Sequence, residues 1–288
     1  MTYPPGDLAW EGGLLDLDAY LARVGYDGAL SPTLDTLRAL QRAHVTSIPF
    51  ENLEIPLGRP VRLGVEAIQD KLVRHRRGGY CFEHTWLFAA ALERLGFAFT
   101  ALSGRVSMGA EKLLPATHAL LRVEADGGPW ICDVGFGAGP LAPLPLEDGA
   151  EDRQGGWAYR LERLTGAAGG LPGVQEWALH QRGPEGWVRR HTFVVAPSYR
   201  IDYEVASHFT ATSPRSPFTG RIFVQRYGPD VHRSLDGTRL TTTHADGRAD
   251  AVEIRELEPG EVPAILAETF GIELDPADAS RLVTAMTV

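Results

Sequence analysis

The sequence predicts an α+β protein built in three parts, because the pattern of apolar residues changes twice along the chain. Apolar residues recur with helical spacing in the first third, alternate in short runs between turns in the middle third, and show both patterns in the last third. We place the parts at 1–96, 97–196 and 197–288. With 288 residues, the chain is long enough to bury an extensive core.

Three helices are expected in the first third. The first begins at Ser31, a residue type that caps helix N-termini, with Pro32 in the first helical position. The second covers residues 65–74, where apolar side chains fall on one face. The third covers residues 81–95 and ends before a glycine, which commonly terminates helices.

Alternating apolar residues between turn signals predict strands in the other two thirds. Asp-Gly-Gly at 126–128 and Asp-Gly at 236–237 predict hairpin turns. The Gly- and Pro-rich stretch 138–156 is expected to be a loop and the nearest thing to a linker. Glycine-rich turns between the central strands favour a small sheet or barrel. Strands are expected at 100–108, 117–123, 130–134, 157–164, 176–181, 187–195, 221–226, 238–243 and 251–256, and helices at 199–207, 261–270 and 278–286.

Charge and composition narrow the classes of function. The chain has 37 acidic and 28 basic residues and a net charge of −9, so nucleic acid and anionic membranes would be repelled on average. No apolar stretch approaches the span of a membrane, and the N-terminus does not read as a signal peptide. The two cysteines, Cys81 and Cys132, are too few for a disulfide framework. We expect a cytoplasmic protein that is a monomer or a weak homodimer.

The segment RRGGYCFEHT at 76–85 is the first candidate for chemistry. Its glycine pair allows a tight turn, and if a helix begins there, Cys81 lies at the helix N-terminus. The dipole and unpaired amides of that terminus favour negative charge, so a thiol there ionises more easily and becomes a nucleophile. The same amides can donate to an oxyanion on an attacked carbonyl. The alternative is that Cys81 is an ordinary buried helix residue.

A base and a carboxylate come from the two strands that flank the Asp-Gly-Gly turn. In the first strand, His118 points to the face opposite Ala119 and Leu121, and Asp133 lies near the end of the second. A turn centred near Gly127 places His118 and Asp133 diagonally across the hairpin, within reach of long side chains. Together with the thiol of the helix, they form a candidate Cys–His–Asp triad.

The sequence resembles the arylamine N-acetyltransferases in five segments that occur in the same order. The Arg-Gly-Gly-x-Cys-x-Glu signature of that family is matched at 77–83, its His strand at 117–119, and its Asp-Val-Gly-Phe-Gly segment at 133–137. Ile-Pro-Phe-Glu-Asn is matched at 48–52, and Ser-x-x-Pro-x-Ser-x-Phe in part at 211–218. Each segment alone is a weak signal, but their joint occurrence is highly specific.

This resemblance implies a three-part, cysteine-protease-like fold: an N-terminal helical domain that carries Cys81, a central β-barrel that carries His118 and Asp133, and a C-terminal α/β lid. It implies acetyl-coenzyme A as donor, an arylamine or arylhydrazine as acceptor, a ping-pong mechanism through acetyl-Cys81, and a role in xenobiotic metabolism. By the same resemblance, Phe136 and Phe209 are expected to line the acceptor slot. The residues that hold the coenzyme stay unassigned, because the sequence has no dinucleotide or Walker phosphate loop.

The chain departs from the family pattern at Thr85 and Ser207, where the family usually has Asn, and neither change removes the triad. Arg77 and Glu83 are expected to form an ion pair, either buried or solvated, that supports the turn before the cysteine.

The sequence offers one alternative kind of site, a metal centre, and three alternative classes of function. No metal is expected, because His75, Cys81, His84 and Cys132 do not fit standard zinc spacing. A thiol protease or transglutaminase would use the same triad, as would an amide synthase that closes a macrolactam from a carrier-bound acyl chain, and a non-enzyme could keep the fold. No ligand spacing is evident in the remaining histidines, His44, His180, His191, His208, His232 and His244.

Overall fold

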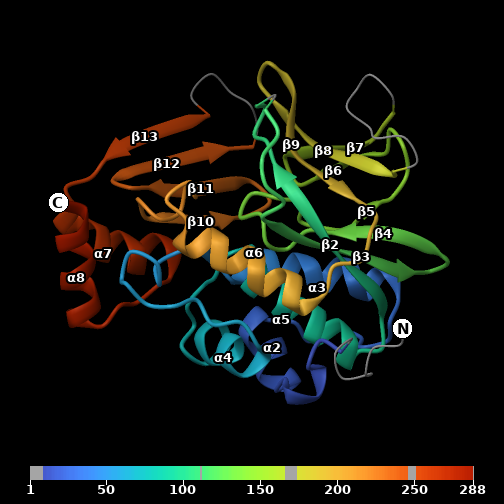
Figure 1. Ribbon diagram of the computed structural model, residues 1–288, viewed down its shortest axis with the longest axis horizontal. Helices are drawn as coiled ribbons and strands as arrows, with labels where there is room; N and C mark the ends of the chain where they lie inside the picture. Colours follow the sequence, from blue (N-terminus) through green and yellow to red (C-terminus); the bar gives the residue numbers. More distant parts are fainter. Residues whose placement is uncertain (1–8, 111, 166–173, 246–250, 288) are drawn as a thin grey trace.

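Two antiparallel sheets and the helices packed on them make up the protein (Figure 1). The structure, a computed structural model, describes residues 9–110, 112–165, 174–245 and 251–287. The predicted α+β fold in three parts is confirmed, while the boundaries between the parts stay a prediction. Within the described residues, no helix combines the length and the apolar character that crossing a bilayer requires.

The N-terminal region is helical, as its apolar spacing predicts. The expected helix at 65–74 forms as an α-helix with a π-helical continuation. The expected cap at Ser31 is wrong, because the extended backbone of Thr33 lets its hydroxyl accept the amide of Thr36 at 3.3 Å. The helical segments are η1 (Gly12–Leu14), α2 (Leu17–Val24), α3 (Leu34–Ser47), α4 (Val65–Gln69), η2 (Asp70–Arg74) and α5 (Cys81–Arg94).

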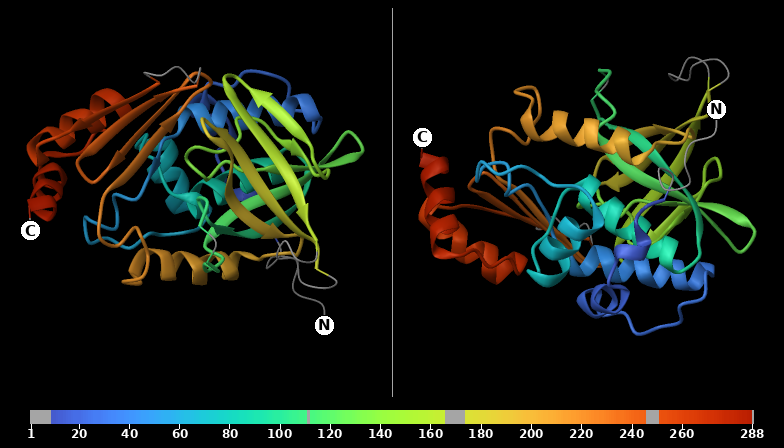
Figure 2. Two further views of the ribbon diagram at one scale, coloured as in Figure 1. Left: turned by 90° about the horizontal axis from the view of Figure 1, so that it is seen from above. Right: turned by 60° about the horizontal axis from the view of Figure 1, so that its bottom comes forward.

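The central region is one eight-stranded antiparallel sheet that curls into a nearly closed barrel (Figure 2). The stretch 138–156 is not a linker, because it contributes two edge strands and buries Leu141 and Leu144 completely. In sheet order, the strands are β5 (Leu144–Pro145), β4 (Gly128–Cys132), β3 (His118–Ala125), β2 (Ala98–Val106), β9 (Gly186–Val194), β8 (Glu176–Gly183), β7 (Trp157–Leu164) and β6 (Glu151–Gln154).

The C-terminal region is a five-stranded sheet with helices on one side, and α6 (Arg200–Thr212) runs in front of the two sheets in Figure 1. Its edge strand β1 comes from the N-terminal third, so this sheet joins distant parts of the chain. Strand β11 was not expected from the sequence. The sheet order is β1 (Phe50–Glu51), β10 (Phe223–Tyr227), β11 (Val231–Asp236), β12 (Arg239–His244) and β13 (Val252–Glu256), followed by η4 (Pro259–Glu261), α7 (Val262–Ile265), η5 (Leu266–Phe270) and α8 (Pro276–Thr287).

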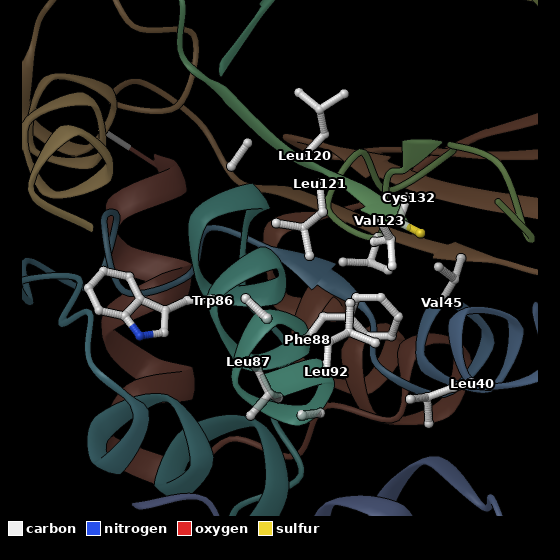
Figure 3. Packing of buried hydrophobic residues seen from close by; sticks show 14 of the residues in the cluster. Leu40, Val45, Trp86, Leu87, Phe88, Leu92, Leu120, Leu121, Val123 and Cys132 are labelled. Carbon is white, nitrogen blue, oxygen red and sulfur yellow. The ribbon is translucent and has the colours of Figure 1, made fainter. Parts of the chain in front are cut away.

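Helix α5 lies at the centre of the core. Twelve of its fourteen residues are buried, so the helix is enclosed on all sides, and its buried polar residues gather in the first turns. Figure 3 shows Phe88 of this helix beside Val123 of β3, and Leu87 on the other side of the helix in the same buried cluster. Because close-packed interiors resist displacement, this packing fixes the N-terminus of α5 relative to the β3–β4 hairpin.

Candidate active site

Cys81 is the first residue of α5, at the end of a tight turn that requires two glycines. A Cβ on Gly78 would lie 2.0 Å from the carbonyl oxygen of Pro49, and a Cβ on Gly79 would lie 2.8 Å from a carboxylate oxygen of Glu83. Glu83 also accepts the amide of Tyr80 at 3.0 Å, which caps the helix. The thiol therefore lies at the positive end of the helix dipole, as predicted.

The β3–β4 hairpin brings His118 and Asp133 together. Asp126 and Gly127 form its two-residue turn with φ of 48° and 79°, and the pairing extends to Leu121 opposite Cys132. His118 begins β3 and Asp133 directly follows β4, so both lie at the open end of the hairpin. Nε2 of His118 is 2.9 Å from Oδ2 of Asp133, and both side chains are buried.

The thiol of Cys81 completes the cluster. It hydrogen bonds to the ring of His118, and since Nε2 faces Asp133, Nδ1 is the nitrogen left for the sulfur. Sγ also lies 3.5 Å from the carbonyl oxygen of Thr117. Gly135 permits the close approach, because a Cβ there would lie 2.7 Å from Cα of Cys81. The structure thus brings together the three residues that the sequence analysis singled out.

A fourth residue, His191, was missed by the sequence analysis. Its Nε2 lies 2.9 Å from the same Oδ2 of Asp133, and its ring centroid is 4.8 Å from that of His118. Within the described part of the chain, Oδ1 of Asp133 and Nδ1 of His191 have no hydrogen-bond partner. Because β9 and the hairpin are far apart in sequence and share no motif, no local signal could have found this residue.

The charges in this cluster favour a protonated His118 beside an ionised Asp133. Burial opposes charge on both side chains, but the carboxylate raises the pKa of His118 to about 10. In turn, the hydrogen bonds and charge of His118, with a further bond from His191, hold the pKa of Asp133 well below its usual value. Burial lowers the pKa of His191, so that ring is a neutral donor.

Phe136 lies against this cluster, whereas Phe209 lies elsewhere on the described surface. The ring of Phe136 is perpendicular to that of His118, with centroids 5.2 Å apart, and it is 5.4 Å from that of His191. Phe209 is half-buried on α6, and its ring faces the guanidinium of Arg215 at 5.5 Å. Among the described residues, no ring contact joins the two phenylalanines.

The predicted Arg77–Glu83 ion pair does not form. Nζ of Lys71 reaches Glu83 at 2.8 Å, whereas Arg77 pairs with Glu51 at 2.8 Å and with Glu54 at 3.2 Å. The physical reason is that β1 and the start of η2 place other charges nearer to each partner. These ion pairs are largely buried and brace the turn before the cysteine.

The two departures from the family pattern both make contacts near the cluster. Thr85 donates its hydroxyl to the carbonyl oxygen of Ala119 at 3.0 Å, which ties α5 to β3. The hydroxyl of Ser207 contacts that of Tyr80, which also donates to the Ser207 carbonyl at 3.3 Å. Both substitutes therefore keep a hydrogen bond at these positions.

In the described part of the chain, one group of side chains has metal-ligand spacing: His118, Asp133 and His191, whose ligating atoms lie within 4.8 Å. The hydrogen bonds to the carboxylate already account for this grouping. His191 therefore lies at ligand spacing, contrary to the expectation from the sequence, whereas His75, Cys81, His84 and Cys132 do not form such a group among the described residues.

Two large hollows lie away from the cluster. One of about 710 Å³ is lined mainly by charged side chains around Arg77 and Asp278. The other, of about 830 Å³, lies between the segment 55–67 and α6 and is lined by Ser207 and His208. Neither is lined by the triad residues, so the structure does not assign the coenzyme to either hollow.

Comparison with known proteins defines the class first: the family described as N-acetyltransferase matches residues 33–279. The arylamine N-acetyltransferase of Mycolicibacterium smegmatis is 41% identical over 267 residues, which cover 90% of this chain and 93% of that protein. The arylamine N-acetyltransferase of Escherichia coli is 35% identical over 264 residues, which cover 91% of this chain and 90% of that protein. The crystal structure of the Nocardia farcinica arylamine N-acetyltransferase has a TM-score of 0.93 and 54% identity, covering 99% of this chain and 100% of that one.

A further similar structure is the Mycobacterium marinum arylamine N-acetyltransferase in complex with CoA, with a TM-score of 0.83 and 35% identity over 94% of this chain and 98% of that one. The chain therefore belongs to the arylamine N-acetyltransferase family and is a transferase.

Proposed function

We propose that this protein moves an acetyl group from acetyl-coenzyme A to an arylamine or arylhydrazine through an acetyl-Cys81 intermediate. The observation that carries the proposal is the hydrogen-bonded chain Cys81–His118–Asp133 at the N-terminus of α5. Family membership supports the acetyl donor and the amine acceptor, and the complex of the M. marinum relative with CoA supports the donor.

Before the first half-reaction, the thiol proton of Cys81 resides on Nδ1 of His118, which makes a thiolate–imidazolium pair, and the thiolate then attacks the thioester carbonyl. Backbone amides at the start of α5 can donate to the oxyanion that forms. The carbon–sulfur bond to coenzyme A then breaks, and His118 returns the proton to the departing thiolate. Asp133 holds the imidazole in the tautomer and orientation that this transfer needs.

In the second half-reaction, the amine attacks the acetyl carbonyl of the enzyme thioester. His118 accepts the amine proton, the bond to Cys81 breaks, and the amide leaves. We include Phe136 and Phe209 in the acceptor slot: Phe136 because it packs on His118, Phe209 from the family resemblance alone. Burial of the triad limits access of water, the competing nucleophile.

Initial-rate kinetics test the proposal. Parallel double-reciprocal lines, with coenzyme A released before any amine is added, are expected because one thiol carries one acetyl group at a time. Intersecting lines without that release would overturn it. Activity on a peptide without an acyl-coenzyme A would favour the protease alternative, and activity with a carrier-bound acyl chain alone would favour the amide synthase. An unreactive thiol would favour the non-enzyme.

Both cysteines are free, which suits the cytoplasm, and we propose a monomer or weak homodimer there.

A further inference from the structure

Arg190 occupies an irregular position in strand β9 next to the active site. Leu179 of β8 pairs with His191, and the following residue His180 pairs with Arg189, so Arg190 has no pairing partner in β8. This is a β-bulge, in which one strand carries an extra residue and the side-chain alternation is broken. As a result, two consecutive residues reach the catalytic cluster: His191 bonds to Asp133, and Arg190 lies over Phe136.

The guanidinium of Arg190 lacks an anionic partner. It lies 5.0 Å from the ring centroid of Phe136, and the side chain is only partly exposed. No carboxylate of the described residues is within salt-bridge distance, and its Nε is buried without a hydrogen bond. Burial lowers the pKa of this group, because the nearby charge of Asp133, which makes no salt bridge to it, offsets the cost of desolvation only in part.

The nearest polar side chains are already bonded to one another. The Tyr159 hydroxyl donates to the carbonyl oxygen of Gly139 at 2.9 Å and contacts the hydroxyl of Tyr227, which also accepts from Gln181 at 3.2 Å. Tyr159 and Tyr227 lie near Arg190, and burial raises the pKa of both hydroxyls, so they stay uncharged and do not neutralise the guanidinium. A half-buried guanidinium that makes no salt bridge to the described residues, and whose Nε has no hydrogen-bond partner, is suited to a bidentate contact with a planar anion.

We propose that Arg190 binds a carboxylate on the ring of the acceptor, so that the enzyme prefers arylamines that carry an acid group over neutral ones. The inference rests on the proposed function. The acceptor amine must reach Cys81, whose sulfur is hydrogen bonded to His118. The ring of Phe136 contacts His118 on one side and the guanidinium of Arg190 on the other. An aromatic ring lying along Phe136 with its amine at the thioester therefore points its far substituent toward the guanidinium.

The diphosphate of the donor is the other anion that Arg190 could bind. The two half-reactions distinguish these anions, because only the first half-reaction uses the donor and only the second uses the acceptor. The variant Arg190→Met keeps the aliphatic stem but removes the charge, Arg190→Gln is a second neutral variant, and Arg190→Lys restores charge without the planar fork. Arg189→Met is the matched control, because Arg189 is the neighbouring residue and donates to the carbonyl oxygen of Ala110 at 3.3 Å.

The assay compares 4-aminobenzoate with 4-methylaniline, a neutral acceptor of similar shape, and separately measures acetylation of Cys81 by acetyl-coenzyme A. In Arg190→Met and Arg190→Gln, kcat/KM for 4-aminobenzoate relative to 4-methylaniline should fall roughly 10- to 100-fold from the wild-type ratio. Because the kcat/KM ratio of each variant is compared with the kcat/KM ratio of the wild type, the intrinsic difference in nucleophilicity between the two amines cancels. Acetylation of Cys81 should stay unchanged, Arg190→Lys should recover part of the ratio, and Arg189→Met should match the wild type.

An equal loss for both acceptors, an unchanged ratio, or a slowed acetylation of Cys81 would overturn the inference; the last would assign the guanidinium to the donor. If the wild-type enzyme were not acetylated at all, the proposed function itself would fall. A normal acetylation rate in the variants also shows that they are folded, so a changed ratio cannot come from misfolding.

Discussion

Replacing Asp133 by Asn tests how the buried carboxylate controls His118. Asn keeps the size of the side chain but removes its charge. In the wild type, the carboxylate holds the pKa of His118 at about 10 although burial opposes it. Without the charge, burial is opposed only by the smaller contribution of Cys81, so the pKa should fall below the ordinary value of about 6.5, a change worth roughly 5 kcal/mol.

The consequence for activity follows from the protonation of His118. At about pH 7.5 the wild-type ring is almost fully protonated, whereas less than about one tenth of the variant rings would be. The imidazolium that balances a thiolate charge is then lost. Alkylation of Cys81 by iodoacetamide should slow by about tenfold or more, and acetylation by orders of magnitude, with the fold intact.

The assay is an NMR titration of the His118 ring, run beside the alkylation and acetylation rates. Asp126→Asn is the matched control, because it makes the same substitution in the same hairpin at an exposed turn position where Asn tolerates the positive φ of 48°. A His118 pKa that stays near 10 in Asp133→Asn, or near wild-type acetylation, would refute the reasoning.

Three further predictions follow from the same geometry. His191→Leu removes one of two donors to Asp133 and should cut acetylation at least tenfold, while His191→Gln, which can still donate, should recover part of it; equal rates in both variants would show that the bond is not needed. Phe136→Ala should raise KM for the acceptor with little change in acetylation of the enzyme, and an unaltered acceptor profile in both Phe136→Ala and Phe209→Ala would exclude the slot. Burial lowers the pKa of His84 in the folded protein to about 4. As the pH falls below about 6.5, the unfolded chain therefore takes up a proton at His84 before the folded protein does, so the free energy of unfolding should decline between about pH 6.5 and pH 4. Urea unfolding at about pH 7.5 and pH 5 should show a smaller loss in His84→Gln than in the wild type, and identical losses would contradict this.

The linkage of His118 has the opposite sign. Its pKa is raised in the folded state, so the stability that its ion pair contributes is complete below about pH 6.5 and is lost as the pH rises from there to about 10. This is the same interaction that Asp133→Asn removes.

The features that the sequence predicted are those with local causes. The hairpin between β3 and β4 follows from Asp126-Gly127, which favours a two-residue turn, and it alone places His118 and Asp133 at one end. Likewise, the glycine pair directly before Cys81 predicts the tight turn that leads into α5, although the contact that requires Gly78, with the carbonyl oxygen of Pro49, comes from a distant segment. Both inferences needed only neighbouring residues.

The features that were missed depend on contacts between distant strands. His191 of β9 meets Asp133, at the end of β4, across β2 and β3. The bulge at Arg190 is a property of the β8–β9 register that no residue type signals. The ion pair of Arg77 was misassigned because Glu51 reaches it from β1. Strand β11 was missed because most of its residues are polar or only half-buried, so the alternation is weak.

The central claim is that Cys81 carries the acetyl group, and intact-protein mass spectrometry after incubation with acetyl-coenzyme A alone tests it most directly. The account predicts one added acetyl group, mapped to Cys81, that is present in Cys132→Ser, absent in Cys81→Ser, and discharged when an arylamine is added. An unmodified wild-type protein that nevertheless forms the amide once the amine is present, or an acetyl group on any other residue, would contradict it.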